Sequence, residues 1–166
     1  MARLGLILND PSEELVAELD GILPSFWSHR NPIDMVASAG GDVGSRVVAA
    51  VAKSPDVDAV VVLSVLGVPH TGGEVRAASA TSDFDDFSPW ETSFLEGIAA
   101  LMEETGKPII NVPDLPIRRA LLSGVHAYTP VVLPTPRAAA LAFDRMARYG
   151  AWRRKHSDDP QQEDAR

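Results

Sequence analysis

The run of apolar residues within Val57–Leu66, V-D-A-V-V-V-L-S-V-L, constrains the fold of this chain more than any other stretch. From Ala59 to Leu63 every residue is apolar, and polar and apolar positions do not alternate. An unbroken β-branched run of this length predicts a strand that is buried on both faces. Such strands are central strands of parallel α/β sheets, in which ligands gather at the carboxyl ends of the strands. We therefore expect a site in the segment that follows, from Gly67 to Gly73.

The other apolar segments alternate between patterns typical of strands and patterns typical of helices. Further strands are expected at Arg3–Leu8, Ile109–Val112 and about Pro130–Leu133. Helices are expected at Pro11–Leu23, Asp42–Lys53, Ser88–Gly106 and Ile117–Leu122, with a long one from Thr135-Pro136. This order predicts an α/β fold, namely a flavodoxin-like or Rossmann-like parallel sheet of about four strands in a three-layer α/β/α arrangement.

Two helix starts have recognisable capping residues. Asn9-Asp10-Pro11 offers an N-cap followed by proline at the first helical position, and Ser88-Pro89-Trp90-Glu91 is a capping box. In the last helix, Ala139, Ala142, Phe143, Met146 and Ala147 are expected on the inner face.

Composition limits the class of protein and its partners. The length of 166 residues suits one domain, residues 1–155, followed by a polar tail, residues 156–166, that is expected to be disordered. Apolar runs fall well short of the roughly 20 residues of a membrane span, and the absence of cysteine fits the cytoplasm. A net charge of −8 argues against nucleic acid or an anionic membrane as the partner.

Several polar residues have both a structural and a functional interpretation. The Gly40–Gly41 turn precedes a helix and either presents amides to a phosphate or only forms the turn. His70 follows the apolar strand, where it is either a catalytic group or, more often, an exposed loop histidine. Ser64 is expected to be a core serine, and Arg118-Arg119 could face an anion. A metal site at His70 and Glu74, or at Asp83, Asp85 and Asp86, matches no known ligand spacing.

Four segments in order resemble one protein family. They are Asn31-Pro32-Ile33-Asp34, the strand entry from Ser54 to Val62, Lys107-Pro108-Ile109-Ile110, and the stretch from Pro130 to Ala140 that leads into a Tyr-Gly-x-Trp-Arg-Arg helix. Together they resemble the carboxyl-side CoA-ligase domain of NDP-forming acyl-CoA synthetases, the superfamily of succinyl-CoA synthetase. The resemblance covers about residues 4–155, with an insertion at 71–89.

The resemblance implies a reaction in which an acid, CoA and ATP or GTP give acyl-CoA, NDP and phosphate. It implies that this domain shapes the CoA and phosphate site, while partner domains carry the phosphohistidine and an ATP-grasp unit that binds the nucleotide with Mg. The implied CoA- or phosphate-facing residues are Asn31, Pro32, Asp34, Gly40 and Gly41, with His70 near the same edge but not matching the phosphohistidine. No catalytic residue is assigned, and a homo-oligomer is possible.

One part of the family pattern is missing from this sequence. The family domain opens with a strand and an N-G-G-G-P-G turn, and no such unit precedes Arg3. We expect a gap beside Val57–Leu66, filled by a strand from a partner or by the N-terminal strand itself, and we do not expect the chain to be catalytic alone. Two alternatives stay open: a CoA-responsive or structural interaction module with Asp83–Phe87 as its docking surface, and an independent hydrolase or transferase that uses His70.

Overall fold

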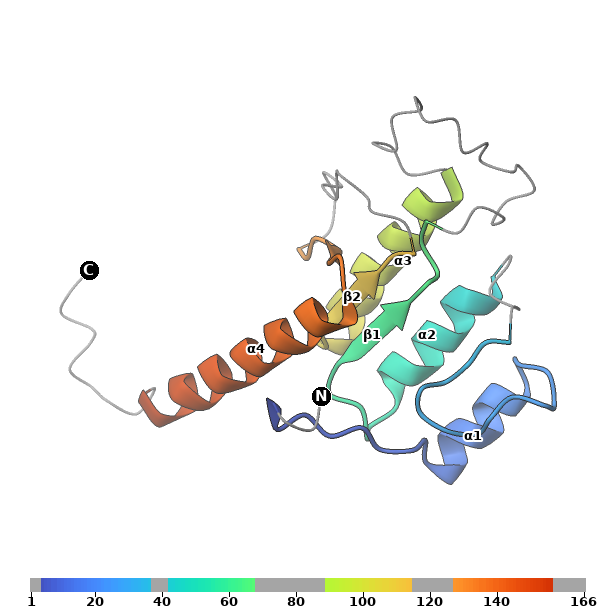
Figure 1. Cartoon of the computed structure of the whole chain (residues 1–166), viewed down its shortest axis with the longest axis horizontal. Helices are drawn as coiled ribbons and strands as arrows, with labels where there is room; N and C mark the ends of the chain where they lie inside the picture. Colours follow the sequence, from blue (N-terminus) through green and yellow to red (C-terminus); the bar gives the residue numbers. More distant parts are fainter. Residues whose placement is uncertain (1–3, 37–41, 68–88, 115–126, 157–166) are drawn as a thin grey trace.

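The computed structural model describes residues 4–36, 42–67, 89–114 and 127–156 (Figure 1). These residues hold a three-stranded, fully parallel sheet in the order β1-β2-β3. Its strands are β1 (Val60–Leu63), β2 (Ile109–Val112) and β3 (Val131–Val132). Val60 lies opposite Ile109, and Ile110 lies opposite Val131. The predicted α/β class with a parallel sheet is confirmed.

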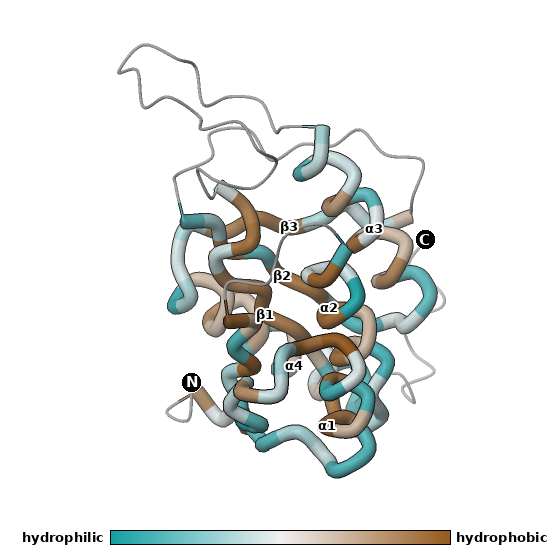
Figure 2. Tube along the Cα trace, turned by 90° about the vertical axis from the view of Figure 1, so that its right-hand side faces the viewer, coloured by the Kyte–Doolittle hydropathy of each residue, from teal (hydrophilic) through white to brown (hydrophobic). Residues whose placement is uncertain are grey.

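Helices cover both faces of the sheet. Along β2, Ile109 belongs to the core shared with α2 (Val43–Lys53) and α3 (Pro89–Thr105). Ile110, the next residue, belongs to the core shared with α4 (Pro136–His156), because successive side chains of a strand point to opposite faces. α1 (Glu13–Asp20) packs on α2 rather than on the sheet. In Figure 2 the strands form an apolar layer inside the described chain.

The strand predictions need two corrections. The run Val57–Leu66 contributes only the four residues of β1, which is an edge strand of the described sheet, whereas β2 is central and wholly buried. The strand expected at Arg3–Leu8 is not found among the described residues from Leu4 onward. Ile7 and Leu8 are exposed, and only Leu6 packs against the core. The residues of this segment favour a strand, but a strand forms only when it pairs with a neighbour, and this segment pairs with none of the described strands.

The helix predictions are mostly confirmed, with a shifted start for α1. Its N-cap is Ser12, whose side chain accepts a hydrogen bond from the N–H of Leu15, and not Asn9 or Asp10. α2 starts after Asp42 and α3 starts at Pro89, as predicted. The helix expected at 117–122 and the tail from 157 onward lie outside the described residues.

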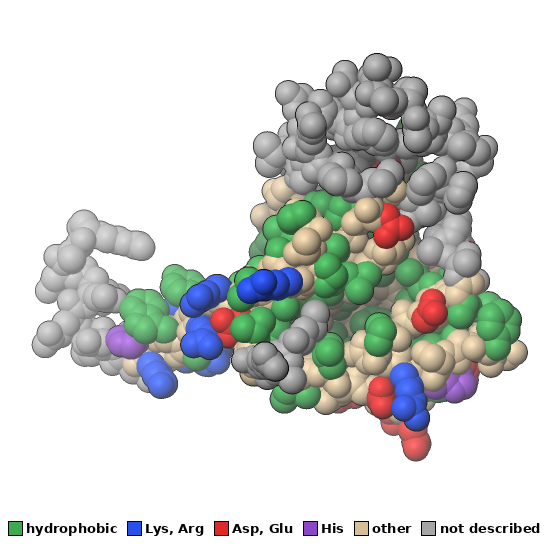
Figure 3. All heavy atoms as spheres, in the orientation of Figure 1, with side chains coloured by type: hydrophobic (Ala, Val, Ile, Leu, Met, Phe, Trp, Pro, Cys, Tyr) green, Lys and Arg blue, Asp and Glu red, His purple; other side chains and the backbone are tan. Residues whose placement is uncertain are grey.

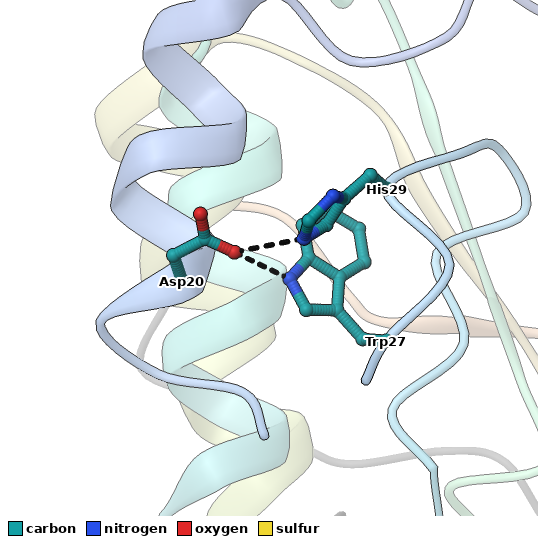
Figure 4. Close-up of polar contacts among 3 residues, drawn as sticks. All are labelled: Asp20, Trp27 and His29. Atoms are coloured by element: carbon teal, nitrogen blue, oxygen red, sulfur yellow. Dashed lines mark hydrogen bonds and ion pairs between the residues drawn. The ribbon is translucent and has the colours of Figure 1, made fainter. Parts of the chain in front are cut away.

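Polar contacts among three side chains hold the connection that follows α1 against the end of this helix. The indole Nε1 of Trp27 donates to Asp20 Oδ1 at 2.8 Å, and Nε2 of His29 lies 3.0 Å from the same oxygen (Figure 4). The indole of Trp27 is buried in the core between α1 and α2. Asp20 therefore fixes the loop that carries the sequence Asn31-Pro32-Ile33-Asp34.

The second half of α4 differs from its prediction. Ala139 and Phe143 are buried, but Met146 and Ala147, which were expected on the inner face, are exposed. The reason is visible in Figure 1, where α4 runs beyond the sheet, so its later turns have no layer to pack on. Within the described chain, no helix combines the length and the apolar character that a membrane span requires.

Candidate functional site

The carboxyl edge of the sheet is the best defined candidate site. Beyond the strands, the N–H of Ser64 donates to the carbonyl of Val112 at 2.9 Å, and the N–H of Asp114 donates to the carbonyl of Leu66 at 3.0 Å. These bonds hold the ends of β1 and β2 together. The first turn of α3 reaches the same edge, because Glu91 contacts Gly67. A helix N-terminus at the carboxyl ends of parallel strands favours anionic ligands.

Glu91 joins α3 to the end of β1. Its Oε1 accepts a hydrogen bond from the N–H of Gly67 at 2.8 Å, and the side chain is only 3% exposed. Gly67 has a positive φ of 72°, a conformation in which glycine is favoured. The N-terminal end of α3 also stabilises a carboxylate at this position. Sequence reasoning found Glu91 only as a capping-box residue, because nothing in the local sequence indicates that it reaches β1.

Asn111 is a second polar group that sequence reasoning missed. It lies on β2, opposite Val62 and Val132, and it is fully buried. Its Nδ2 lies 3.5 Å from the carbonyl oxygen of Val131, and its Oδ1 has no hydrogen-bond partner. A buried acceptor without a partner is uncommon in proteins and calls for an explanation. The only sequence signal was one asparagine within the apolar strand I-I-N-V.

Ser64 requires a correction. It was expected in the core, but it is exposed directly after β1 and has a positive φ of 58°. Such a conformation is uncommon for residues other than glycine, asparagine and aspartate, and it is often found at functional sites. Ser64 therefore belongs to the carboxyl-edge site together with Gly67, Glu91, Asn111 and Asp114.

The predicted residues Asn31 and Pro32 lie elsewhere. The N–H of Asn31 donates to Asp10 Oδ1 at 3.2 Å, and its Nδ2 donates to the carbonyl of Asn9 at 3.0 Å. The peptide bond between Asn31 and Pro32 is cis. These contacts hold Asn31 beside the start of α1, at the opposite end of the helical layer from the first turn of α3 (Figure 1). The structure does not bring Asn31 together with Glu91.

Asp34 lies on the connection between Asn31 and α2. Its Oδ1 accepts a hydrogen bond from the N–H of Val36 at 2.8 Å, and the residue is exposed. The predicted residues Gly40, Gly41 and His70 lie outside the described residues, as do Glu74, Asp83, Asp85, Asp86, Arg118 and Arg119. Their roles remain predictions.

The described groups at the carboxyl edge are suited to binding a ligand. Among the residues described, no group of three or more His, Asp or Glu side chains is arranged to hold a metal ion. The pair of Asp20 and His29 is half-exposed, and the same carboxylate oxygen also accepts the indole N–H of Trp27. The carboxyl edge instead offers backbone groups, a helix N-terminus and polar side chains to a ligand.

The fold and the site place this chain in the class of parallel α/β domains that bind ligands at the carboxyl edge of the sheet. No protein-family model matches the chain. The chain is 27% identical over 124 residues to the acetate–CoA ligase [ADP-forming] II subunit alpha of Pyrococcus furiosus, and the match covers 68% of this chain and 26% of that subunit.

Solved structures agree with this relationship. The fold matches the dinucleotide-forming acetyl-coenzyme A synthetase 1 of Ca. Korarchaeum cryptofilum, both in complex with phosphate and ADP and in its apo form. The TM-score is 0.60 at 26% identity, and the match covers 90% of this chain and 29% of that one. The chain is thus similar to one part of these acetate–CoA ligases and acetyl-CoA synthetases, in agreement with the resemblance that the sequence motifs indicated. It spans between a quarter and a third of the length of these relatives.

Proposed function

We propose that this chain is the CoA-ligase-like part of an NDP-forming acyl-CoA synthetase. The complete reaction would convert an acid, CoA and ATP or GTP into acyl-CoA, NDP and phosphate. The observation that carries the proposal is the match over 90% of this chain to only 29% of a dinucleotide-forming acetyl-CoA synthetase. A chain of this extent supplies one domain of the enzyme, residues 1–155, and acts with other domains or subunits. The cytoplasm, expected from the absence of cysteine, is part of the same proposal.

In this role the carboxyl edge contributes to the CoA and phosphate site. The N-terminus of α3 supplies a favourable potential for phosphate, and Glu91 fixes the β1 end beside it. The predicted CoA- or phosphate-facing residues, Asn31, Pro32, Asp34, Gly40, Gly41 and His70, are part of the same proposal. Nucleotide and Mg belong to partner domains in this proposal, and the phosphohistidine and ATP-grasp units are placed there too.

The outer edge of β1 is where a partner segment fits. The N–H groups of Val60 and Ser64 donate to β2, so the intervening N–H groups of Val61 and Leu63 point to the other side. Among the described residues no strand lies on that side. An open apolar strand edge readily accepts a further strand, from another polypeptide or from another segment of a longer one.

The test is reconstitution. The chain is mixed with a polypeptide that carries the phosphohistidine and ATP-grasp units, and acid-dependent release of NDP and phosphate is followed in the presence of CoA. We expect turnover only in the mixture. Formation of neither a complex nor a product by any such polypeptide would refute the proposal.

A non-catalytic, CoA-responsive interaction module is the second candidate. It is favoured by the outer edge of β1, beside which no strand lies among the described residues. Titration calorimetry with CoA separates the two candidates: CoA binding together with a complex that never turns over acid and nucleotide would support the module.

A further inference from the structure

The last twelve residues of α4, 145–156, form a segment that we call the α4 arm. The buried residues of α4 all precede it: Ala139, Ala140, Phe143 and Asp144. No residue of the arm is buried, and the arm extends away from the rest of the described fold (Figure 1). Most of the stability of a helix in a protein comes from tertiary packing, and the arm, which continues the packed first turns of the 21-residue α4, has no buried residue of its own. Its surface is therefore a strong candidate for a contact with another molecule.

The arm exposes a row of large apolar side chains. Met146, Tyr149 and Trp152 follow one another at intervals of three and are 50%, 61% and 49% exposed. The rings of Tyr149 and Trp152 stack with centroids 6.0 Å apart, and Trp152 stacks on His156 at 4.6 Å. A contiguous exposed aromatic surface on a soluble domain marks an interaction site.

The arm is also strongly basic. It contains no acidic residue and five basic ones, Arg145, Arg148, Arg153, Arg154 and Lys155, in a chain whose net charge is −8. Arg148 is paired with Asp144 at 2.8 Å, and this contact raises the pKa of Arg148 above its ordinary value. Arg154 and Lys155 form no ion pair with any described residue. Figure 3 shows the cationic side chains gathered on this part of α4.

The end of the described chain formed by α1, which we call the α1 end, has a charge opposite to that of the arm. α1 carries Glu13, Glu14, Glu18 and Asp20 and no basic residue. The three glutamates are exposed and form no ion pair within the described part of the chain. The connection that follows α1 exposes Phe26 at 75%. Ile7 and Leu8, which are 82% and 60% exposed, lie in the segment that leads from Leu6, packed on the β2–α4 core, to α1. In Figure 1, α1 and the α4 arm lie at opposite ends of the longest axis.

We infer that the α4 arm of one molecule docks on the acidic α1 end of a second copy of this chain. Cations meet carboxylates, and the aromatic row meets exposed apolar side chains of the α1 end. A contact between two arms would bring like charges together, so a symmetric pairing of arms is disfavoured. A contact that joins two different surfaces continues into a ring or an open chain of copies. This inference does not depend on the proposed enzymatic function.

Sedimentation and light scattering on the full chain test this directly. At low ionic strength we expect the weight-average mass to rise with protein concentration, and high salt to reverse the rise because exposed charges are screened. Two charge-reversal variants isolate the ends. Arg153→Glu with Arg154→Glu and Lys155→Glu changes the net charge of the arm from +5 to −1 (5 − 6). Glu13→Arg with Glu14→Arg and Glu18→Arg changes the net charge of α1 from −4 to +2 (−4 + 6). Each variant alone should weaken association at least about tenfold.

Mixing these two variants gives the sharpest readout. The acidic arm of one then meets the basic α1 end of the other, and the remaining two ends are also complementary, so mixed association should return. Trp152→Ala should weaken association, while Arg137→Glu, an exposed change at the start of α4, should not. Circular dichroism verifies that each variant is folded.

Several results would contradict docking of the arm on a second copy. A monomeric mass at every concentration would overturn the inference. So would association that survives in both charge-reversal variants, or mixtures of the two variants that fail to associate. Binding of the arm to vesicles of anionic lipid without any self-association would assign the surface to a membrane instead and would also overturn it.

Discussion

Glu91 shows how one side chain connects an element to the site. Its carboxylate is buried at the start of α3 and accepts the N–H of Gly67, at the point where β1 ends. Removing this acceptor would leave a buried backbone donor without its partner, and the cost of that exceeds the modest net value of an ordinary hydrogen bond.

We therefore expect Glu91→Ala to lower the free energy of unfolding by about 1–3 kcal/mol. Glu91→Gln keeps an oxygen acceptor and should cost less. Glu96→Ala is the control, since Glu96 is exposed on the same helix and its loss should change stability by less than about 0.5 kcal/mol. Urea unfolding measures all three. Equal losses for Glu91→Ala and Glu96→Ala would mean that the Gly67 contact contributes nothing.

For Asn111 we predict the opposite effect, namely that removing its polar side chain stabilises the chain. Its buried Oδ1 lacks a partner, and an unpaired buried polar group costs roughly 1–3 kcal/mol. Asn111→Leu has a similar size and should stabilise the chain by about 1 kcal/mol, while Asn111→Asp should destabilise it by several kcal/mol because it buries a charge. Thermal unfolding distinguishes these outcomes. If Asn111→Leu destabilises the fold, the amide makes a contact that the chain needs for its own stability.

At the scale of elements, β1 has two chemically different edges. One edge pairs with β2, while the other has no strand beside it among the described residues. Because the N–H groups of a strand alternate in direction, the N–H groups of neighbouring residues of β1 point to different edges of the strand.

Amide hydrogen exchange should show this alternation. In the isolated chain we expect protected amides at Val60, Val62 and Ser64, which face β2, and at least about 100-fold faster exchange at Val61 and Leu63. Two-dimensional NMR resolves the individual amides. Uniform protection along the strand would show that the outer edge is already covered.

Much of this arrangement could be predicted from the sequence. Periodicity and capping residues located α2, α3 and β2 closely, and ordered motifs indicated the family. Apolar content alone wrongly predicted a central position for Val57–Leu66, because it does not reveal whether a neighbouring strand is present, whereas the strand missing from the family pattern led us to expect a gap beside it. For the same reason Arg3–Leu8 was wrongly expected to be a strand, and Ser64 was wrongly placed in the core.

The site was less predictable than the fold. Glu91 and Asn111 became candidates through long-range contacts and burial, and neither property is encoded in a short sequence pattern. That Asn31 faces the CoA and phosphate site remains a prediction. Its hydrogen bonds to Asn9 and Asp10 depend on the path of a loop between two helices. Only the structure shows the path of this loop.

At the scale of the whole molecule, the proposed function places a partner strand at the open edge of β1, and stability should then depend on that partner. A partner that binds only the folded chain stabilises it by mass action, by about 2.7 kcal/mol when its concentration is 100 times Kd. We expect the polypeptide carrying the phosphohistidine and ATP-grasp units to produce a shift of this size in urea unfolding.

A proline in β1 tests whether the stabilisation comes through the open edge. Val61→Pro removes an N–H that β2 does not use, and proline is tolerated at such edge positions, so the isolated chain should lose only about 1 kcal/mol. The same change removes a donor from any strand added outside β1, and the partner should then give little stabilisation. Val62→Pro is the matched control: it removes an N–H that faces β2 and should unfold the chain. If the Val61→Pro variant gains the full partner effect, the partner binds elsewhere and the outer edge of β1 has another use.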